Sequence, residues 1–225
     1  MRHLLLKESV CCSRAWPKTS TRSLSSGASG RLGQRVYPYL FVDARYEKVR
    51  VGSRVISEGL LIVTAVRDDG QREILTVQTA DTESEATYHE LLRSLKARGL
   101  CGVELVTSDD YPGLEAAIRR HFQGASWQRC QVHYARNLLR IVPFSKREEL
   151  AEGLSRGVFA APTREMALNL AEQLADRWRS KGYPKVADHL EEHVEECLSC
   201  LAFPESHRKR IRTTNGLERL NQEIK

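Results

Sequence analysis

The sequence predicts an α+β fold, in which a mixed sheet with flanking helices leads into an α-helical region. Runs rich in β-branched residues alternate with helical patterns as far as Tyr134, and beyond Tyr134 the pattern is helical throughout. The chain has 225 residues, of which 41% are hydrophobic and 28% are charged. That composition supports a sizeable core under a charged surface. No apolar run approaches the roughly 18 residues that a membrane span needs.

The net charge of +6 is concentrated at the N-terminus. Residues 1–36 hold seven of the 35 basic residues and one of the 29 acidic residues, which leaves 28 of each sign in the remainder. We expect residues 1–36 to be a disordered basic arm, because they are rich in Ser, Gly and Arg and lack periodicity. An organelle transit peptide is the less favoured interpretation of this arm. The six cysteines are scattered, which favours reduced thiols and an intracellular, cytoplasmic protein.

Residues 37–134 are predicted to form the first part of the sheet domain. Three strands are expected in YLFVDARYEKVRV, VISEGLLIVTAV and REILTVQTA, with a hairpin turn at Asp68-Asp69-Gly70. A helix follows from Ser84 to Gly99, then a strand in GVELVTSD, a helix in YPGLEAAIRRHF and a strand-like run in SWQRCQVH. This order of elements is typical of the ribonuclease-H-like (retroviral-integrase-like) fold.

Residues 135–210 are predicted to form a helical insertion. Prolines divide this stretch into helices near 134–141, 145–159, 163–180 and 185–201, and FPESH ends the last of them. Residues 211–225 are expected to return to the sheet domain as a final helix that Asn215 caps. Its buried stripe would be Leu217, Leu220 and Ile224.

Three acidic residues are candidates for a metal site. Asp43 lies inside the first predicted strand, and Asp109 directly follows the fourth predicted strand. In a ribonuclease-H-like sheet the first and fourth strands pair. Glu218 lies on the polar face of the final helix. Each acid alone is more often a cap or a solvated residue than a ligand, and Asp110 in particular fits an N-cap or first-turn acid. Together, three carboxylates suit Mg²⁺ or Mn²⁺, which prefer oxygen ligands, and two such ions can activate and stabilise phosphodiester oxygens.

A second cluster combines Cys130 and His133 with Cys197 and Cys200. Two such pairs could hold zinc. The favoured alternative is that Cys197 and Cys200 are ordinary core residues, because they share helical spacing with other apolar positions.

From about Tyr37 to Lys225 the chain resembles the mutator-type transposases of bacterial insertion sequences. The matching stretches are YPYLFVDARYEKVR, LVTSDDYPGLEAAI, WQRCQVHYARNLL and LAFPESHRKRIRTTNGLERLNQEIK. The resemblance implies a catalytic, metal-binding triad at Asp43, Asp109 and Glu218. It also implies that Cys130 and His133 support the site, and that Arg219 and Asn221 orient the glutamate or a phosphate.

The resemblance implies DNA cleavage and strand transfer at the ends of an insertion sequence, by a homo-oligomer that is at least a dimer. DNA, as terminal inverted repeats and as target, would be its partner. Residues 1–36 do not look like the family's end-recognition region, and a basic stretch is expected beyond Lys225, so we expect a chain shortened at both ends. Two alternatives follow: an inactive remnant, and a ribonuclease-H-like nuclease without strand transfer.

Overall fold

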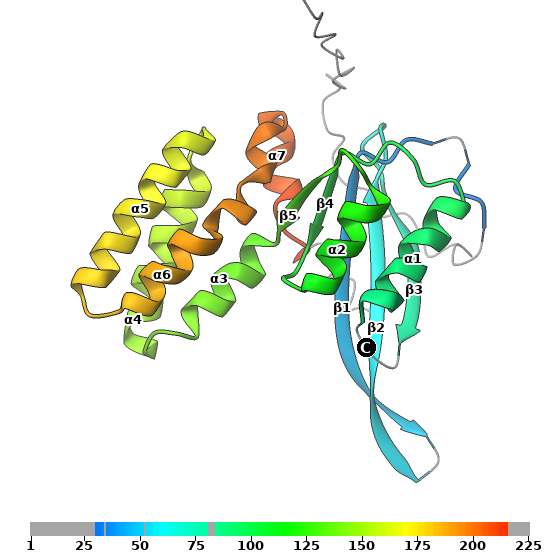
Figure 1. The fold of residues 1–225 in the computed structure, drawn as a ribbon, viewed down its shortest axis with the longest axis horizontal. Helices are drawn as coiled ribbons and strands as arrows, with labels where there is room; N and C mark the ends of the chain where they lie inside the picture. The colour runs from blue at the N-terminus through cyan, green and yellow to red at the C-terminus, as the bar shows by residue number, and fades with distance from the viewer. Residues whose placement is uncertain (1–29, 34, 52, 81–83, 216–225) are drawn as a thin grey trace, which may run out of the picture.

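A computed structural model describes residues 30–33, 35–51, 53–80 and 84–215. Its five strands are β1 (Tyr39–Val51), β2 (Arg54–Val66), β3 (Arg72–Ala80), β4 (Leu105–Ser108) and β5 (Ser126–Arg129). They form one sheet in the order β3-β2-β1-β4-β5. The β3, β2 and β1 strands are antiparallel, whereas β1, β4 and β5 are parallel to one another. This mixed sheet with flanking helices is ribonuclease-H-like, as predicted (Figure 1).

Two helices cover one face of the sheet, α1 (Glu85–Ala97) and α2 (Pro112–His121) (Figure 1). The Ser84 hydroxyl caps α1 by accepting a hydrogen bond from the Thr87 backbone N–H at 3.2 Å. The two helices bury their apolar stripes against the β1 residues Leu40 and Val42 and their neighbours on the same face. Because side chains alternate along a strand, Tyr39, Phe41 and Asp43 point to the opposite face.

The opposite face is packed by the segment that follows the helical region. There α7 (Glu205–Ile211) places Ile211 against Tyr39 and Phe41 in a second apolar cluster. His207 Nδ1 lies 2.8 Å from the Tyr39 hydroxyl oxygen. No helix was expected at Glu205–Ile211, because FPESH was expected to end the preceding helix.

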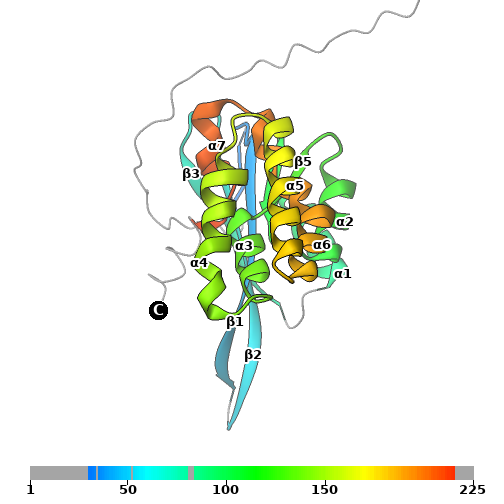
Figure 2. The same ribbon diagram turned by 90° about the vertical axis from the view of Figure 1, so that its left-hand side faces the viewer.

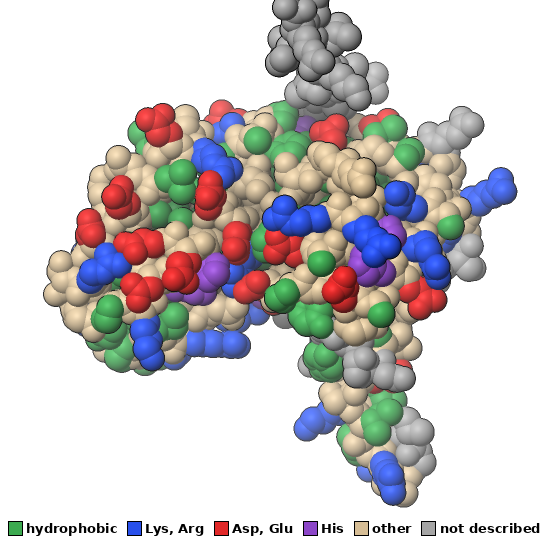
Figure 3. All heavy atoms as spheres, viewed as in Figure 1, with side chains coloured by type: hydrophobic (Ala, Val, Ile, Leu, Met, Phe, Trp, Pro, Cys, Tyr) green, Lys and Arg blue, Asp and Glu red, His purple; other side chains and the backbone are tan. Residues whose placement is uncertain are grey.

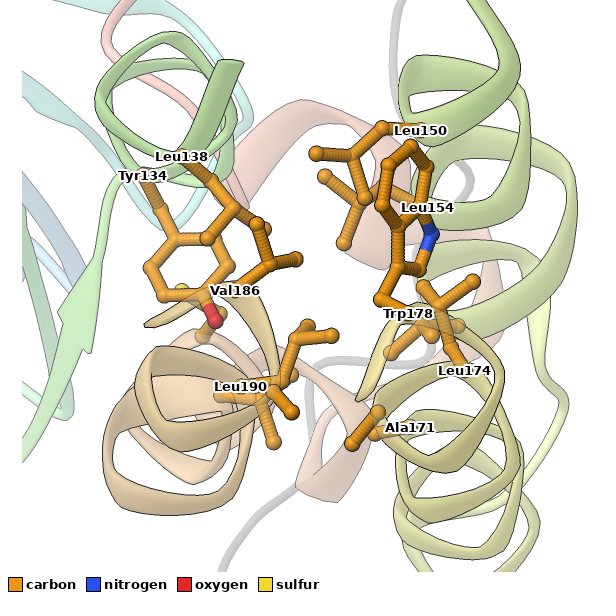
Figure 4. Packing of buried hydrophobic residues seen from close by; sticks show 14 of the residues in the cluster. Tyr134, Leu138, Leu150, Leu154, Ala171, Leu174, Trp178, Val186 and Leu190 are labelled. Carbon is orange, nitrogen blue, oxygen red and sulfur yellow. The ribbon is translucent and has the colours of Figure 1, made fainter. Parts of the chain in front are cut away.

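The helical region is built from α3 (Gln131–Leu139), α4 (Phe144–Glu152), α5 (Arg164–Ser180) and α6 (Pro184–His193). One π-helical turn at Gly153–Gly157 and 3-10 turns at Val158–Ala160, Val194–Cys197 and Ser199–Ala202 complete it. The helices surround an apolar core in which the Trp178 side chain is fully buried (Figure 4). Within the described part of the chain, no helix is long and apolar enough to cross a membrane.

The run SWQRCQVH differs from its prediction as a strand. β5 ends at Arg129, and Gln131 already belongs to α3. The helix starts early because Gln131, Tyr134 and Leu138 are buried at helical spacing, which continues into the following turns.

The end of the predicted basic arm contacts the sheet domain. The Leu32 backbone N–H donates to the Arg98 carbonyl oxygen at 2.8 Å, and Val36 bridges to Cys101. The predicted final helix, with its buried stripe of Leu217, Leu220 and Ile224, lies outside the described residues except for its first residue, Asn215. The boundaries proposed for residues 37–134, 135–210 and 211–225 stay predictions.

Candidate functional site

The pairing of β1 with β4 brings the first two candidate acids to neighbouring positions. Phe41 and Thr107 form the last register pair of the two strands, and Asp43 and Asp109 each lie two residues beyond that pair. Asp43 belongs to the face that α7 covers, and the charges of both acids act on His133. Asp43 is 7% exposed, whereas the Asp109 side chain is 49% exposed. A buried carboxylate costs free energy unless nearby charges or hydrogen bonds compensate it. The burial of Asp43 therefore distinguishes it from an ordinary solvated surface acid.

His133 faces this acid pair from the first turn of α3. Its Nδ1 lies 3.8 Å from Asp109 Oδ2. The hydrogen bond with Cys130 raises the pKa of His133 to about 9, with further support from the charges of Cys130, Asp109 and Asp43, although burial opposes the shift. Burial would raise the pKa of the Cys130 thiol, but the hydrogen bonds with His133 and Thr214 outweigh it and lower that pKa. These interactions favour the protonated form of His133 beside Asp43 and Asp109.

The chain returns to this place after the helical region. The Thr107 hydroxyl donates to the Ile211 carbonyl oxygen at 2.6 Å. The Gln131 N–H donates to the Arg212 carbonyl oxygen at 3.1 Å. The Thr214 N–H and hydroxyl approach Cys130 Sγ at 3.4 and 3.5 Å. These contacts fix residues 211–214 against β4 and the start of α3, next to Asp109.

The other predicted site residues, Glu218, Arg219 and Asn221, lie outside the described residues. Thr214 is four residues before Glu218. Four residues span about 6 Å in a helix and at most about 14 Å when extended. The Cα atom of residue 218 therefore lies at most about 14 Å from that of Thr214.

Asp110 is not an N-cap, contrary to prediction. The cap position of α2 belongs to Tyr111, which makes no side-chain cap hydrogen bond. Asp110 Oδ2 instead pairs at 2.6 Å with Arg129 Nη2, and Arg129 Nη1 pairs at 2.9 Å with Glu196 Oε2. The Arg129 side chain is 2% exposed and its guanidinium lies 5.3 Å from the centre of the Tyr134 ring. Sequence analysis missed Arg129, whose only local signal is a cation at the end of a buried strand.

An arginine-lined cavity of about 550 Å³ lies along the other side of α3. Its apolar wall includes Leu139, Leu154 and Phe159. Val132, next to His133 in sequence, also lines it, so the cavity and the acid pair flank the same helical turn. The arginines that surround it are Arg136, Arg140, Arg147 and Arg212.

The donors at the acid pair suit a hard divalent cation. Asp43 and Asp109 offer carboxylate oxygens from adjacent strands, and Asp109 is open to water. Among the described residues, no group of three or more His, Cys, Asp or Glu side chains could hold a metal ion. The described pair would thus need a third ligand from elsewhere in the chain, a position for which Glu218 is the candidate.

The alternative zinc site is not formed. Cys130, His133, Cys197 and Cys200 are all described, and they do not come together as a metal-binding group. Cys197 and Cys200 are buried in the core, as the favoured interpretation held. Burial raises the pKa of Cys200 to about 11, which keeps it a neutral thiol.

Comparison with known proteins places the chain in a family. Residues 22–225 match the family described as "Transposase, Mutator family", and this match begins within the predicted arm. The transposase for insertion sequence element IS406 of Burkholderia multivorans is 40% identical over 84% of this chain and 48% of its own length. That for IS256 in transposon Tn4001 of Staphylococcus aureus is 37% identical over 86% of this chain and 50% of its own. The chain thus spans about half the length of these curated relatives.

A further relative and a solved structure complete the comparison. The transposase for ISRM5 of Rhizobium meliloti is 41% identical over 84% of this chain and 47% of its own length. Among solved structures, the Drosophila P element transposase strand transfer complex is 12% identical, with a TM-score of 0.30, over 69% of this chain and 49% of that one. On the match across residues 22–225, the chain belongs to the Mutator family of transposases.

Proposed function

We propose that this chain carries the catalytic centre of an insertion-sequence transposase, which cleaves DNA at the element's ends and joins the freed 3′-hydroxyl to target DNA. The observation that carries the proposal is the parallel pairing of β1 with β4, because Asp43 and Asp109 each lie two residues beyond its last pair, Phe41 with Thr107. Family membership supplies the reaction class, because the relatives are transposases of insertion sequences.

The catalytic triad in this proposal is Asp43, Asp109 and Glu218, which would hold Mg²⁺ or Mn²⁺. When bound, such ions activate the attacking oxygen and stabilise the leaving oxygen of a phosphodiester. Asp43 supplies a carboxylate fixed within the sheet, and half-exposed Asp109 supplies one that DNA can reach. Residues 211–214, which contact β4 and Cys130, precede Glu218 by four to seven residues, and this supports its place in the proposed triad.

Two groups beside the triad act as positioning residues. His133 balances the negative charge of the two aspartates, and Cys130 holds both His133 and Thr214 through its sulfur. Arg219 and Asn221 would orient Glu218 or a DNA phosphate. The arginine-lined cavity beside α3 provides positive potential next to the acids, as a polyanionic substrate requires. Because two element ends must be held together, the active form is proposed to be at least a dimer.

The test is a nicking and joining assay with labelled insertion-sequence ends and Mn²⁺. The parent chain is compared with Asp109→Ala and with the matched control Asp110→Ala, which removes the neighbouring carboxylate but not the proposed ligand. We expect Asp109→Ala to lower nicking by about a thousandfold, equivalent to ~4 kcal/mol of transition-state stabilisation. We expect Asp110→Ala to retain most of the parent's activity at a temperature where it is folded.

The products separate the proposal from its alternatives. Equal nicking by the parent and Asp109→Ala would place the activity elsewhere. Hydrolysis of precut ends without joining would indicate a nuclease that lacks strand transfer. Absence of nicking by a folded parent would mean that this half-length chain is not sufficient for catalysis.

A further inference from the structure

The β1–β2 hairpin extends beyond the rest of the sheet as a two-stranded ribbon. β1 pairs with β4 only through Tyr39–Phe41, and β2 meets β3 only from Gly59 onwards. The hairpin continues from Glu47 opposite Glu58 to Val51 opposite Arg54, and no third strand among the described residues pairs with this part. At about 3.4 Å per residue the free part is roughly 17 Å long. Figures 1 and 2 show it projecting away from both the sheet and the helices.

Tyr46 marks the base of this ribbon. It is the cross-strand partner of Gly59, and a Cβ placed on Gly59 would lie 3.7 Å from the Tyr46 ring. The same Cβ would lie 2.9 Å from the Ala80 carbonyl oxygen, so any larger residue at 59 would push against β3. The aromatic ring beside this glycine braces the point where three strands become two.

Cations without partners occupy the free part. Lys48 and Arg50 are exposed, and so is Arg54 on the returning strand. None of the three forms an ion pair with another residue in the part of the chain that the structure describes. Some exposed arginines elsewhere are paired, as with Arg179 to Glu191 and Arg164 to Glu195. Figure 3 shows lysine or arginine side chains along the projecting ribbon.

The two faces of the ribbon differ in charge. Lys48 and Arg50 alternate onto the same face, where their partners are Ser57 and Val55, so this face carries no acid. The acids Glu47 and Glu58 face each other on the other side. Lys48 and Arg50 are two residues apart, about 7 Å, which matches two base-pair steps of duplex DNA at ~3.4 Å each.

We propose that this ribbon is an arm that contacts the phosphates of duplex DNA through Lys48 and Arg50 on its acid-free face. The inference rests on the proposed function, since it concerns the DNA that reaches Asp43 and Asp109. A two-stranded ribbon fits the major groove of B-DNA. From Asp43 to Arg50 the strand covers roughly 24 Å, so the arm meets DNA about seven base pairs from the acid pair.

A second copy of the chain suits the ribbon less well. Exposed Val55 and Ile56 would favour association, but pairing two ribbons would bring their unpaired cations together. Duplex DNA supplies the opposite charge for all of them.

The experiment measures binding of a 30-base-pair duplex by fluorescence anisotropy in EDTA, across 50 to 200 mM salt. Lys48→Gln/Arg50→Gln is compared with the parent and with Arg177→Gln/Lys185→Gln, which removes the same charge from exposed positions on α5 and α6. The salt slope is the steepness with which log affinity falls as log salt concentration rises. Loss of two phosphate contacts lowers this slope by about 1.8. Between 50 and 200 mM salt the parent should therefore lose about 12-fold more affinity than the ribbon variant. The control keeps the parent's slope.

Three results would overturn the proposal. They are a ribbon variant with the parent's slope, a control that loses as much slope as the ribbon variant, and no binding by the parent. Light scattering on the same samples tests whether the ribbon binds a second copy of the chain. If the parent is oligomeric and the ribbon variant is not, the ribbon surface would be assigned to self-association instead. EDTA prevents metal-dependent catalysis, so this assay measures DNA binding alone. The ribbon proposal can therefore fail while Asp109-dependent nicking persists. Equally, Asp109-dependent nicking can be absent while the ribbon variant still shows its smaller salt slope.

Discussion

The sheet domain and the helical region bury different kinds of side chain. Between residues 132 and 206, all of which the structure describes, every buried side chain is apolar or a cysteine. The sheet and its junction with the helices bury polar and charged residues as well. These are Asp43, Thr64, Thr76, Thr107, Ser108, Gln128, Arg129, Gln131, His207 and Thr214.

This difference separates stability from chemistry. Burial of apolar surface contributes about 25 cal/mol per Å² to the free energy of folding and does not require directional partners. The helical region is therefore stabilised mainly by its apolar core. Buried polar groups must be compensated one by one, and they persist where they hold something in place. Part of this polar burial, including Asp43, Thr107, Gln131 and Thr214, lies at the acid pair or where residues 211–214 return to β4 and α3, which is the part of the molecule that the proposed reaction uses.

Trp178→Ala tests whether the helical region depends on apolar packing. The indole is fully buried among α4, α5 and α6, so its loss should lower the free energy of unfolding by about 4 kcal/mol. Denaturant unfolding followed by circular dichroism measures the loss. Trp178→Phe, the matched control, keeps most of the apolar area and should cost less than half as much. Equal costs would show that the helical core is loosely packed.

Arg129→Ala tests the junction between the two regions. It would leave Asp110 and Glu196 without their shared cation and remove a buried side chain. Because both carboxylates are partly in water, we expect a loss of about 2–3 kcal/mol in unfolding free energy rather than the larger cost of a fully buried pair. Exposed Arg179→Gln should shift the unfolding midpoint much less. If the two variants are equally stable, Arg129 does not tie the regions together.

Thr107→Val tests the smallest of these contacts. It deletes the hydroxyl that donates to the Ile211 carbonyl and should cost ~1 kcal/mol of stability. If the hydrogen bond helps to direct residue 218 towards the acids, nicking should fall at temperatures where the variant is fully folded. Thr107→Ser keeps the hydroxyl and should retain the parent's nicking. Unchanged nicking by Thr107→Val would confine this hydrogen bond to stability.

The elements with strong local patterns were predictable. The predicted runs for β1 and β3 coincide with the observed strands, and α1 follows its Ser84 cap and apolar spacing. The start of α3 was misplaced because Cys130-Gln131-Val132-His133 fits either a strand or a first helical turn. α7 was missed because its burial depends on Tyr39 and Phe41, which are distant in sequence.

The candidate site was predictable only in part, for the same reason. Asp43 and Asp109 could be named because each terminates or interrupts an apolar strand, and the predicted pairing of the first and fourth strands is confirmed. The role of Arg129 could not be inferred, since its partners Asp110 and Glu196 are brought together only by the tertiary fold. The ligand roles of Asp43, Asp109 and Glu218 stay predictions.

The contact between Cys130 and Thr214 joins residues 84 positions apart. Ribosomes add roughly 5–20 residues per second, so Thr214 is synthesised about 4–17 s after Cys130. Over that interval β1 and β4 can pair, while residues 211–214 are still being made. In a nascent chain Cys130 therefore lacks its contact with Thr214, and Thr107 its contact with Ile211, until the helical region has been translated.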